Sequence, residues 1–345
     1  IAFDATINGG KTVITINPDS NLSSSQVVYV AIGTSVEDAS NNAINAANAS
    51  FTAADILAPT TTFSPANSAT AVAVASDITL TFNEAVRLTN NSALDDSNVD
   101  ALITLKEDNA SGADIAFDAT INGGKTVITI NPNSNLSSSQ VVYVAIGTSV
   151  EDASNNAINA ANASFTAADI LAPTMIITSA EVSDGASSND STLSMTFTSG
   201  EATSNFVVGD ISVSGGALSS FNATSSTIYT AIFTPLDDGV KTIDVAAGTF
   251  TDSVTNNNTA ATQFNWTYDS SSPTMTITSA EVSDGATSDD STLAMTFTSS
   301  EATSNFVVGD ISVSGGALSS FNATSSTIYT AIFTPLDDGV KTIDV

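Results

Sequence analysis

Acidic side chains near the ends of apolar runs are the residues of this sequence that could bind a ligand. Glu84 follows the run Ile78–Phe82, and Asp152 opens an Asp-x-x-x-Asn pattern that ends at Asn156. Carboxylate and amide oxygens are the ligands that calcium prefers, in sets of about six to eight. The same residue types recur further along the chain, at Glu201, Asp252 and Glu301. The sequence therefore indicates binding of a hard cation, provided that the fold brings these side chains together.

Catalysis is not expected of this chain. It contains neither histidine nor cysteine, so a Ser–His or Cys–His nucleophile cannot form. Disulfides and thiolate metal sites are excluded as well. A hydrolase with paired carboxylates needs one defined pair, and nothing in a set of repeated acids singles one out. We therefore expect no enzyme.

The charge balance bears on the partners of the chain. Its 345 residues include 36 acidic and 6 basic side chains, which give a net charge of −30. Nucleic acid and anionic membrane surfaces are not expected as partners, because phosphate binding requires clusters of Lys and Arg. Cations should be attracted, and their binding would relieve repulsion within the folded state. No apolar run is long enough for direct membrane insertion.

Internal repetition organises the whole sequence. Ile1–Leu57 recurs as Ile115–Leu171, 114 positions later (115 − 1), and the two copies differ only at Asp19 and Asn133. A second, unrelated repeat follows, because Ala172–Val245 recurs 100 positions later (272 − 172) with six differences. A Pro-Thr pair at positions 59, 173 and 273 opens each new unit.

These repeats predict four pieces. Residues 1–57 form the C-terminal part of a type 1 repeat, and residues 58–171 form a complete type 1 repeat. Residues 172–271 form a complete type 2 repeat, and residues 272–345 form the N-terminal part of another. Because the chain starts inside a repeat and not at a methionine, we expect it to be a window on a longer polypeptide.

The local pattern predicts strands throughout. Apolar and polar residues alternate in Ile78–Phe82 and in Leu193–Phe197, as expected for half-buried strands. Turn signals such as Asn8-Gly9-Gly10 and Asp237-Asp238-Gly239 separate such runs. About seven short strands in each unit of roughly 100 residues are typical of a Greek-key sandwich. We predict an all-β chain of tandem sandwiches, arranged as an extended rod.

Two segments carry a specific resemblance. Pro59–Pro65, followed by Ile78–Val86, resembles the Ig-like domain of S-layer and large secreted bacterial proteins. The second repeat type, with Phe297–Thr303, Tyr329–Pro335 and Phe264–Asp269, is similar to another bacterial Ig-like repeat family, typical of large repetitive adhesins. The resemblance implies tandem Ig-like folds at an extracellular surface, and calcium bound at the domain junctions.

Strand direction predicts where the acids meet. In a sandwich whose strands alternate in direction, the second and sixth loops return to the pole at which the first strand starts, and the incoming linker lies there too. We therefore expect interdomain Ca²⁺ sites, although the same acids could also be solvated loop residues with turn and capping roles. The candidate ligands are Asp55, Glu84 and Asp152 at one junction, Asp169, Glu201 and Asp252 at the next, and Asp269 and Glu301 at the last.

Two other residue types are expected to have ordinary structural roles. Lys11, Lys125, Lys241 and Lys341 lie beside turns at strand starts and are predicted to be exposed, which excludes a buried lysine that could form an isopeptide bond. Trp266, near the end of the third piece, is predicted to pack in the core or at a junction and not to form a platform for sugars.

The function expected from these features is structural. We predict an extender, or stalk, segment of an extracellular surface adhesin, whose partners are the neighbouring repeats of the same chain. The alternative is a subunit of an assembled filament, sheath or surface layer, in which identical chains contact one another. A glycan-binding module would require an exposed aromatic patch, which we cannot locate in the sequence.

Overall fold

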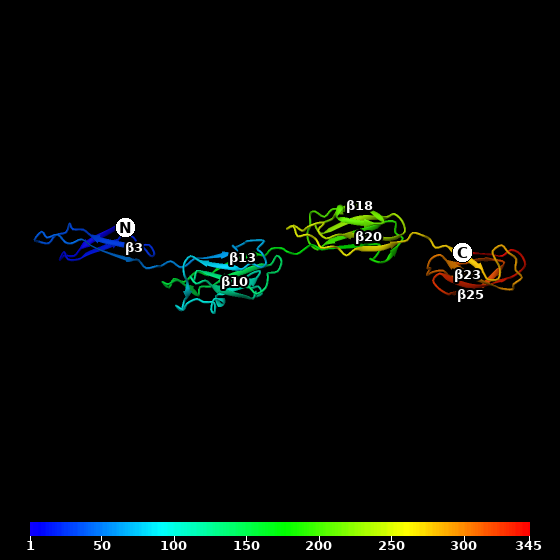
Figure 1. Cartoon of the computed structure of the whole chain (residues 1–345), viewed down its shortest axis with the longest axis horizontal. Helices are drawn as coiled ribbons and strands as arrows, with labels where there is room; N and C mark the ends of the chain where they lie inside the picture. The colour runs from blue at the N-terminus through cyan, green and yellow to red at the C-terminus, as the bar shows by residue number, and fades with distance from the viewer. The chain divides into compact units, whose positions relative to one another are not determined.

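The computed structural model describes all 345 residues, and nearly all of its regular structure is β-strand (Figure 1). The chain divides into two compact units, Ile1–Leu171 and Ala172–Val345, which are described separately. Helical structure is limited to short 3-10 segments, and none has the length and apolar character needed to cross a membrane. These segments are η1 (Asp100–Leu102), η2 (Val208–Asp210) and η3 (Val308–Asp310).

The second repeat is a complete sandwich within the first unit. One sheet has the strand order β5-β6-β10-β9, a second has β13-β11-β8, and a short pair joins β7 to β12. Alternation sets its core, because Ile78, Leu80 and Phe82 of β6 are buried together with Val142 and Val144 of β11. Its strands are β5 (Thr61–Ser64), β6 (Ile78–Phe82), β7 (Arg87–Leu88), β8 (Ile103–Glu107), β9 (Phe117–Ile121), β10 (Val127–Pro132), β11 (Val141–Ile146), β12 (Val150–Glu151) and β13 (Ala161–Thr166).

The third repeat is a complete sandwich within the second unit. Its sheets have the orders β14-β16-β19-β18 and β15-β21-β20-β17. The N-terminal segment of the repeat contributes an edge strand to each sheet. β14 pairs antiparallel with β16 in the first sheet, and β15 pairs parallel with β21 in the second. Its strands are β14 (Met175–Ser179), β15 (Ser187–Ser188), β16 (Leu193–Ser199), β17 (Ile211–Ser214), β18 (Gly216–Ala223), β19 (Ile228–Pro235), β20 (Gly239–Val245) and β21 (Phe264–Tyr268).

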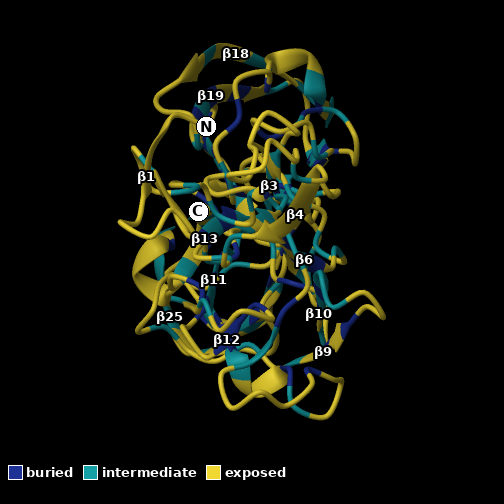
Figure 2. Cartoon of the chain, turned by 90° about the vertical axis from the view of Figure 1, so that its left-hand side faces the viewer, coloured by how far each residue is buried: buried dark blue, intermediate teal, exposed yellow.

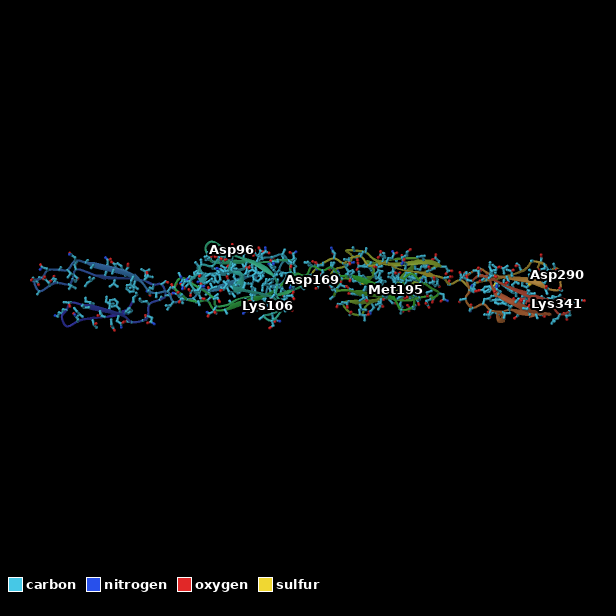
Figure 3. The ribbon with its side chains drawn as sticks, turned by 90° about the horizontal axis from the view of Figure 1, so that it is seen from below. Asp96, Lys106, Asp169, Met195, Asp290 and Lys341 are labelled. Atoms are coloured by element: carbon cyan, nitrogen blue, oxygen red, sulfur yellow. The ribbon has the colours of Figure 1, made fainter.

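Aromatic side chains fill the interior of the third repeat. Met195 lies in the middle of this repeat (Figure 3), where it is 1% exposed. The ring of Phe233 meets the indole of Trp266 edge-on, with centroids 4.8 Å apart. Trp266 is itself 1% exposed, so the prediction that it packs in the core is confirmed. An indole in this position cannot serve as a platform for sugars.

One lysine departs from expectation. Lys241 was predicted to be exposed, but only 2% of its side chain is accessible, and its Nζ lies 2.7 Å from Oδ1 of Asp237. Lys241 is directly opposite Trp266 in the β20–β21 ladder, and the two side chains share the inner face. The lysine stem reaches the rim beneath Gly215, where a Cβ would stand 2.6 Å from Cδ of the lysine.

The fourth repeat retains one full sheet and part of the other. The order β22-β23-β26-β25 repeats that of the third repeat, but the second sheet is reduced to β24 and β27. Its buried core is correspondingly smaller, with Phe297 and Phe333 at its centre. The strands are β22 (Met275–Ser279), β23 (Leu293–Ser299), β24 (Ser312–Ser314), β25 (Gly316–Ala323), β26 (Ile328–Pro335) and β27 (Thr342–Asp344).

The first repeat forms two hairpins without a shared core. β1 (Phe3–Ile7) pairs with β2 (Ile14–Pro18), and β3 (Val27–Ile32) pairs with β4 (Ala47–Thr52). β1 and β4 carry the colour of exposed residues in Figure 2. Phe51 on β4 is 52% exposed, whereas Phe165, its counterpart on β13, is 2% exposed. The prediction of tandem all-β sandwiches is confirmed, while the extended rod and the four domain boundaries stay predictions.

Candidate metal centre

Three of the predicted ligands lie together in the first unit. Asp55 belongs to the segment after β4, Glu84 lies between β6 and β7, and Asp152 directly follows β12. One carboxylate oxygen from each lies within 4.8 Å of the others. The end of the first repeat and two loops of the second thus converge, as the alternation of strand direction predicts.

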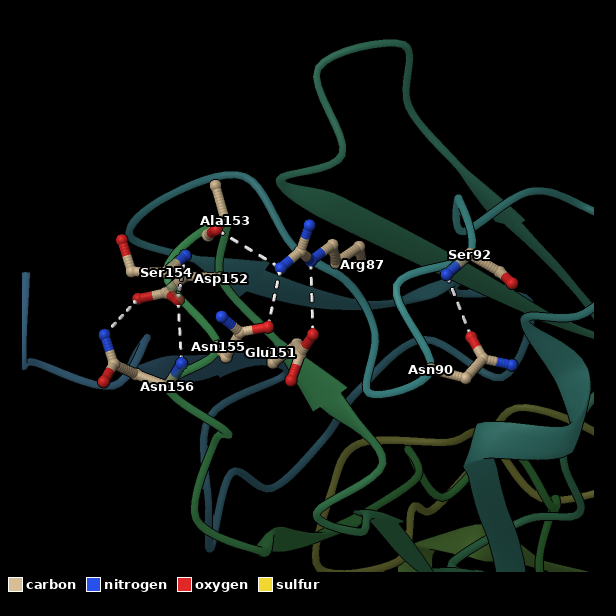
Figure 4. A network of polar contacts seen from close by, with 9 residues as sticks. All are labelled: Arg87, Asn90, Ser92, Glu151, Asp152, Ala153, Ser154, Asn155 and Asn156. Atoms are coloured by element: carbon tan, nitrogen blue, oxygen red, sulfur yellow. Dashed lines mark hydrogen bonds and ion pairs between the residues drawn. The ribbon is translucent and has the colours of Figure 1, made fainter.

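Asp152 is held by its own loop (Figure 4). Its Oδ1 accepts hydrogen bonds from the backbone N–H groups of Ser154, at 2.7 Å, and Asn156, at 2.9 Å. Its Oδ2 accepts a third from Nδ2 of Asn156 at 2.8 Å. With 1% of its surface exposed, this carboxylate has a fixed orientation. The Asp-x-x-x-Asn pattern therefore encodes a closed loop that presents one acid.

Arg87 braces the same loop from the other side (Figure 4). Its Nε lies 3.2 Å from Oε1 of Glu151. Its Nη2 donates to the carbonyl oxygen of Ala153 at 3.2 Å and to Oδ1 of Asn155 at 3.1 Å. The sequence analysis missed this role, although Arg87 is the sole arginine of the chain, and that rarity was an available signal.

Asp55 links the first repeat to the second. Its Oδ1 accepts from Oγ of Ser24 at 2.6 Å and from the backbone N–H of Leu57 at 3.2 Å. Its backbone carbonyl accepts from Nδ2 of Asn156 at 3.2 Å. Asn156 thus contacts Asp152 and Asp55 together, which positions the segment after β4 against the loop that follows β12.

The electrostatics of the centre are unfavourable for a third negative charge. Burial raises the pKa of Glu84, and the nearby carboxylates of Asp152 and Asp55 raise it further. Burial also acts to raise the pKa of Asp152, but the hydrogen bonds from Asn156 and Ser154, together with Arg87, outweigh it and leave this pKa below its ordinary value. Asp152 is thus held as an anion, while ionisation of Glu84 is opposed.

The donor set fits a hard cation. Carboxylate oxygens from three separate segments lie close to one another, and the chain contains neither cysteine nor histidine. Oxygen-only surroundings suit calcium or magnesium, and calcium tolerates the irregular, many-ligand geometry that loops provide. A divalent ion here would offset the repulsion that raises the pKa of Glu84.

In the second unit, Glu201 follows strand β16 as Glu84 follows β6 in the first unit, and Asp252 lies in a loop like that of Asp152. The Asp252 loop repeats that of Asp152, with Oδ1 accepting from the N–H groups of Val254 and Asn256, both at 2.9 Å. Asn205 replaces the arginine brace there, since its Oδ1 accepts from the N–H of Thr251 at 3.0 Å.

The remaining predicted ligands are less complete. Asp169 lies at the end of the first unit, where its Oδ1 accepts from Oγ of Ser138 at 2.7 Å, as Asp55 does from Ser24. Its grouping with the two acids of the second unit stays a prediction. Asp269 and Glu301 are not part of a group of three carboxylates, because the fourth repeat has no counterpart of Asp252 in this chain.

Comparison with solved structures finds proteins of low sequence identity. Invasin, titled a bacterial integrin-binding protein, is 14% identical with a TM-score of 0.31, and the match covers 83% of this chain and 56% of that one. Domains 1–6 of the surface layer protein SbsC are 11% identical with a TM-score of 0.23, covering 82% and 52%. This chain thus spans little more than half of either structure. No curated protein matches it.

Sequence profiles identify the repeats more directly. One profile described as a bacterial Ig-like domain matches residues 55–167. A second profile with the same description matches residues 169–268 and again residues 269–345. Together these matches cover most of the chain, in agreement with the sandwich fold of the repeats. The chain therefore belongs to the bacterial Ig-like domain family.

Proposed function

We propose that this chain is a structural extender segment of an extracellular surface adhesin, stiffened by calcium at its repeat junctions. Family membership and the tandem arrangement of two repeat types support a spacer that lies outside the cell, on its surface. The absence of His and Cys leaves no nucleophilic dyad, so the proposed role is not enzymatic.

The observation that carries the calcium proposal is the convergence of Asp55, Glu84 and Asp152 within 4.8 Å. Asp55 follows the last strand of one repeat, whereas the other two acids belong to loops of the next. A cation bound by all three would tie the connecting segment to the following sandwich. Motion of the segment between the two repeats would then be restricted.

We extend the proposal to the later junctions on the sequence pattern alone. Asp169, Glu201 and Asp252 are the ligands proposed for a second ion, and Asp269 with Glu301 for an incomplete third. Affinity should be modest, on the order of 10⁻⁴–10⁻³ M, as is usual for extracellular calcium modules.

Calorimetric titration and small-angle scattering of the full chain test this proposal. We expect a calcium-binding heat, and an increase in flexibility when a chelator removes the ion. Glu84→Gln should weaken binding, while Asp118→Asn, which alters an exposed acid on β9, should leave it unchanged. If there is no binding heat and the scattering is identical with and without chelator, the acids are solvated loop residues.

A further inference from the structure

The two complete repeats share one strand arrangement, although their sequences are unrelated. In the third repeat, β15 runs parallel to β21, with Ser187 opposite Thr267. In the second repeat, an isolated parallel bridge joins Val72 to Ala167, which directly follows β13. In both repeats, therefore, an early segment lies beside the last strand and runs in the same direction.

In the third repeat, the pairing of these two segments begins at Asp184. Its Oδ1 accepts the backbone N–H of Asn265 at 2.7 Å and the Nδ2 group of the same residue at 2.9 Å. The N–H of Gly185 donates to the carbonyl oxygen of Asn265 at 2.6 Å. The N–H of Thr267 then donates to the carbonyl oxygen of Ala186 at 2.9 Å. One side chain and three backbone segments thus fix the register of the last strand.

The second repeat has the same hydrogen bonds at the same spacing. Oδ1 of Asn67 accepts the backbone N–H of Ser164 at 2.9 Å. The N–H of Ser68 donates to the carbonyl oxygen of Ser164 at 2.6 Å, and the N–H of Thr166 donates to that of Ala69 at 2.8 Å. Asn67 therefore has the position in the second repeat that Asp184 has in the third.

The turn that presents this side chain is also the same in the two repeats. The residue after the Asn or Asp has a left-handed backbone, with φ of 65° at Ser68 and 79° at Gly185. The next N–H closes the turn in each case, from Ala69 in the second repeat and from Ala186 in the third. A serine seldom adopts this conformation. Its occurrence here, in a sequence unrelated to the third repeat, points to a requirement that both repeats share.

The parallel direction of the pairing determines how it responds to tension. Tension along the chain pulls the early segment from its start and the last strand from its end. Because the two strands are parallel, the force runs along both of them in opposite senses, and the evenly spaced hydrogen bonds between them are loaded together. In a hairpin pulled at its two ends, the bonds would instead break one after another.

We propose that this pairing is the mechanical clamp of each complete repeat, that is, the contact that sets its resistance to stretching. Asp184 and Asn67 are the side chains that hold the last strand in register within the clamp. The proposal rests on the proposed extender function, because a stalk is a segment that carries tension. It does not depend on calcium binding.

Constant-force stretching of the full chain in chelator tests the clamp. The chain has no cysteine of its own, so handles at Leu171→Cys and Ser272→Cys, both exposed positions, apply the force across the third repeat. Asp184→Ala should raise the rate at which this repeat unfolds under force by about tenfold, because a hydrogen bond to a charged group is lost from the clamp. Forced unfolding reports that rate directly.

Asp210→Ala is the matched control within the same repeat. Oδ2 of Asp210 accepts the backbone N–H of Val207 at 2.8 Å, so this variant removes one carboxylate and one accepted bond outside the clamp. Thermal melting without force should be lowered in both variants, whereas the unfolding rate under force should rise mainly in Asp184→Ala. Equal rates under force in the two variants, or an unchanged rate in Asp184→Ala, would overturn the proposal.

The second repeat provides an independent test if Asp184→Ala disturbs the fold of the third. With handles at Leu57→Cys and Leu171→Cys, Asn67→Ala should speed unfolding of the second repeat under force, and Asp184→Ala should leave that rate unchanged. A rate that does not respond to Asn67→Ala would count against the clamp and leave the extender proposal in place. Scattering that is identical with and without chelator bears on the extender proposal alone, so the two failures are distinguishable.

Discussion

Glu84 is the residue of the candidate metal centre whose ionisation the fold opposes. Burial, and then Asp152 and Asp55, raise its pKa above the ordinary value of 4.5. An acid whose pKa is higher in the folded than in the unfolded state contributes stability at low pH, and this contribution is lost as the pH rises through the folded-state pKa. In the absence of a cation, ionised Glu84 therefore weakens the second repeat at neutral pH.

We expect this effect to appear in calorimetric melting of the wild type and Glu84→Gln in chelator at a series of pH values. The variant should become more stable relative to the wild type as the pH rises above 4.5, because glutamine cannot ionise. Calcium should narrow that difference by stabilising the wild type, by about 2.7 kcal/mol when its free concentration is 100-fold above the dissociation constant. Parallel pH curves for the two proteins would contradict the electrostatic account.

Arg87 gives a second prediction at the residue scale. Removing one partner of a buried ion pair lowers the free energy of unfolding by about 3–5 kcal/mol. Because the Arg87 side chain is 28% exposed, we expect Arg87→Met to lose stability near the lower end of that range. The loss should be visible as faster hydrogen exchange in β10 and β11. Lys106→Met is the matched control, because its partner Asp114 is 85% exposed and surface pairs contribute about 1 kcal/mol or less. Equal losses in the two variants would show that Arg87 is not a brace.

The candidate ligands could be predicted because topology alone brings loop positions to one pole. Asp152 follows from the spacing of its Asp-x-x-x-Asn loop, and Glu84 from its place after β6. The contact of Arg87 with Glu151 could not be predicted. It depends on the pairing of β7 with β12, and strands of two residues are too short to show an alternating pattern in the sequence. The burial of Lys241, by contrast, could have been predicted. Lys241 lies two and four residues before the buried Ile243 and Val245, and therefore on the same side of β20. A strict two-residue period would have predicted its burial, and the neighbouring turn obscured that signal.

At the scale of elements, identical strands behave differently according to what covers them. β4 and β13 have the same sequence, yet Phe51 is 52% exposed and Phe165 is 2% exposed. Alternation predicts the strand but not its burial, which requires the opposing sheet. The sequence therefore predicted strands in residues 1–57, and these residues have no common core because no opposing sheet covers them.

This difference gives a prediction with an internal control. Phe165→Ala should destabilise the second repeat by about 3–5 kcal/mol, as is typical for truncation of a buried phenylalanine. Phe51→Ala, in the same local sequence, should change stability by about 0.5 kcal/mol or less. Thermal melting followed by circular dichroism measures both variants. Similar losses would mean that the face around Phe51 is covered in solution.

At the scale of the whole molecule, stability should differ among the four repeats. The second and third repeats have complete cores, the fourth has a reduced core, and Val28 is the single buried apolar residue of the first. Native-state hydrogen exchange should therefore be slowest in β6, β11, β16 and β19, intermediate in β23 and β26, and fastest in β1–β4. Uniform protection along residues 1–345 would contradict this prediction.

The near-identity of Ile1–Leu57 and Ile115–Leu171 has a consequence for folding. The two segments can offer residues 58–114 almost the same contacts, because they differ at a single position. Within one chain, residue 114 leads directly into the second copy, whereas the first copy is joined to the other end of residues 58–114, and this connectivity favours the second copy. Between chains at high concentration that advantage is lost, so refolding should partition between monomers and swapped dimers. The outcome of folding would then be decided by chain connectivity and kinetics, and not by the specificity of the core.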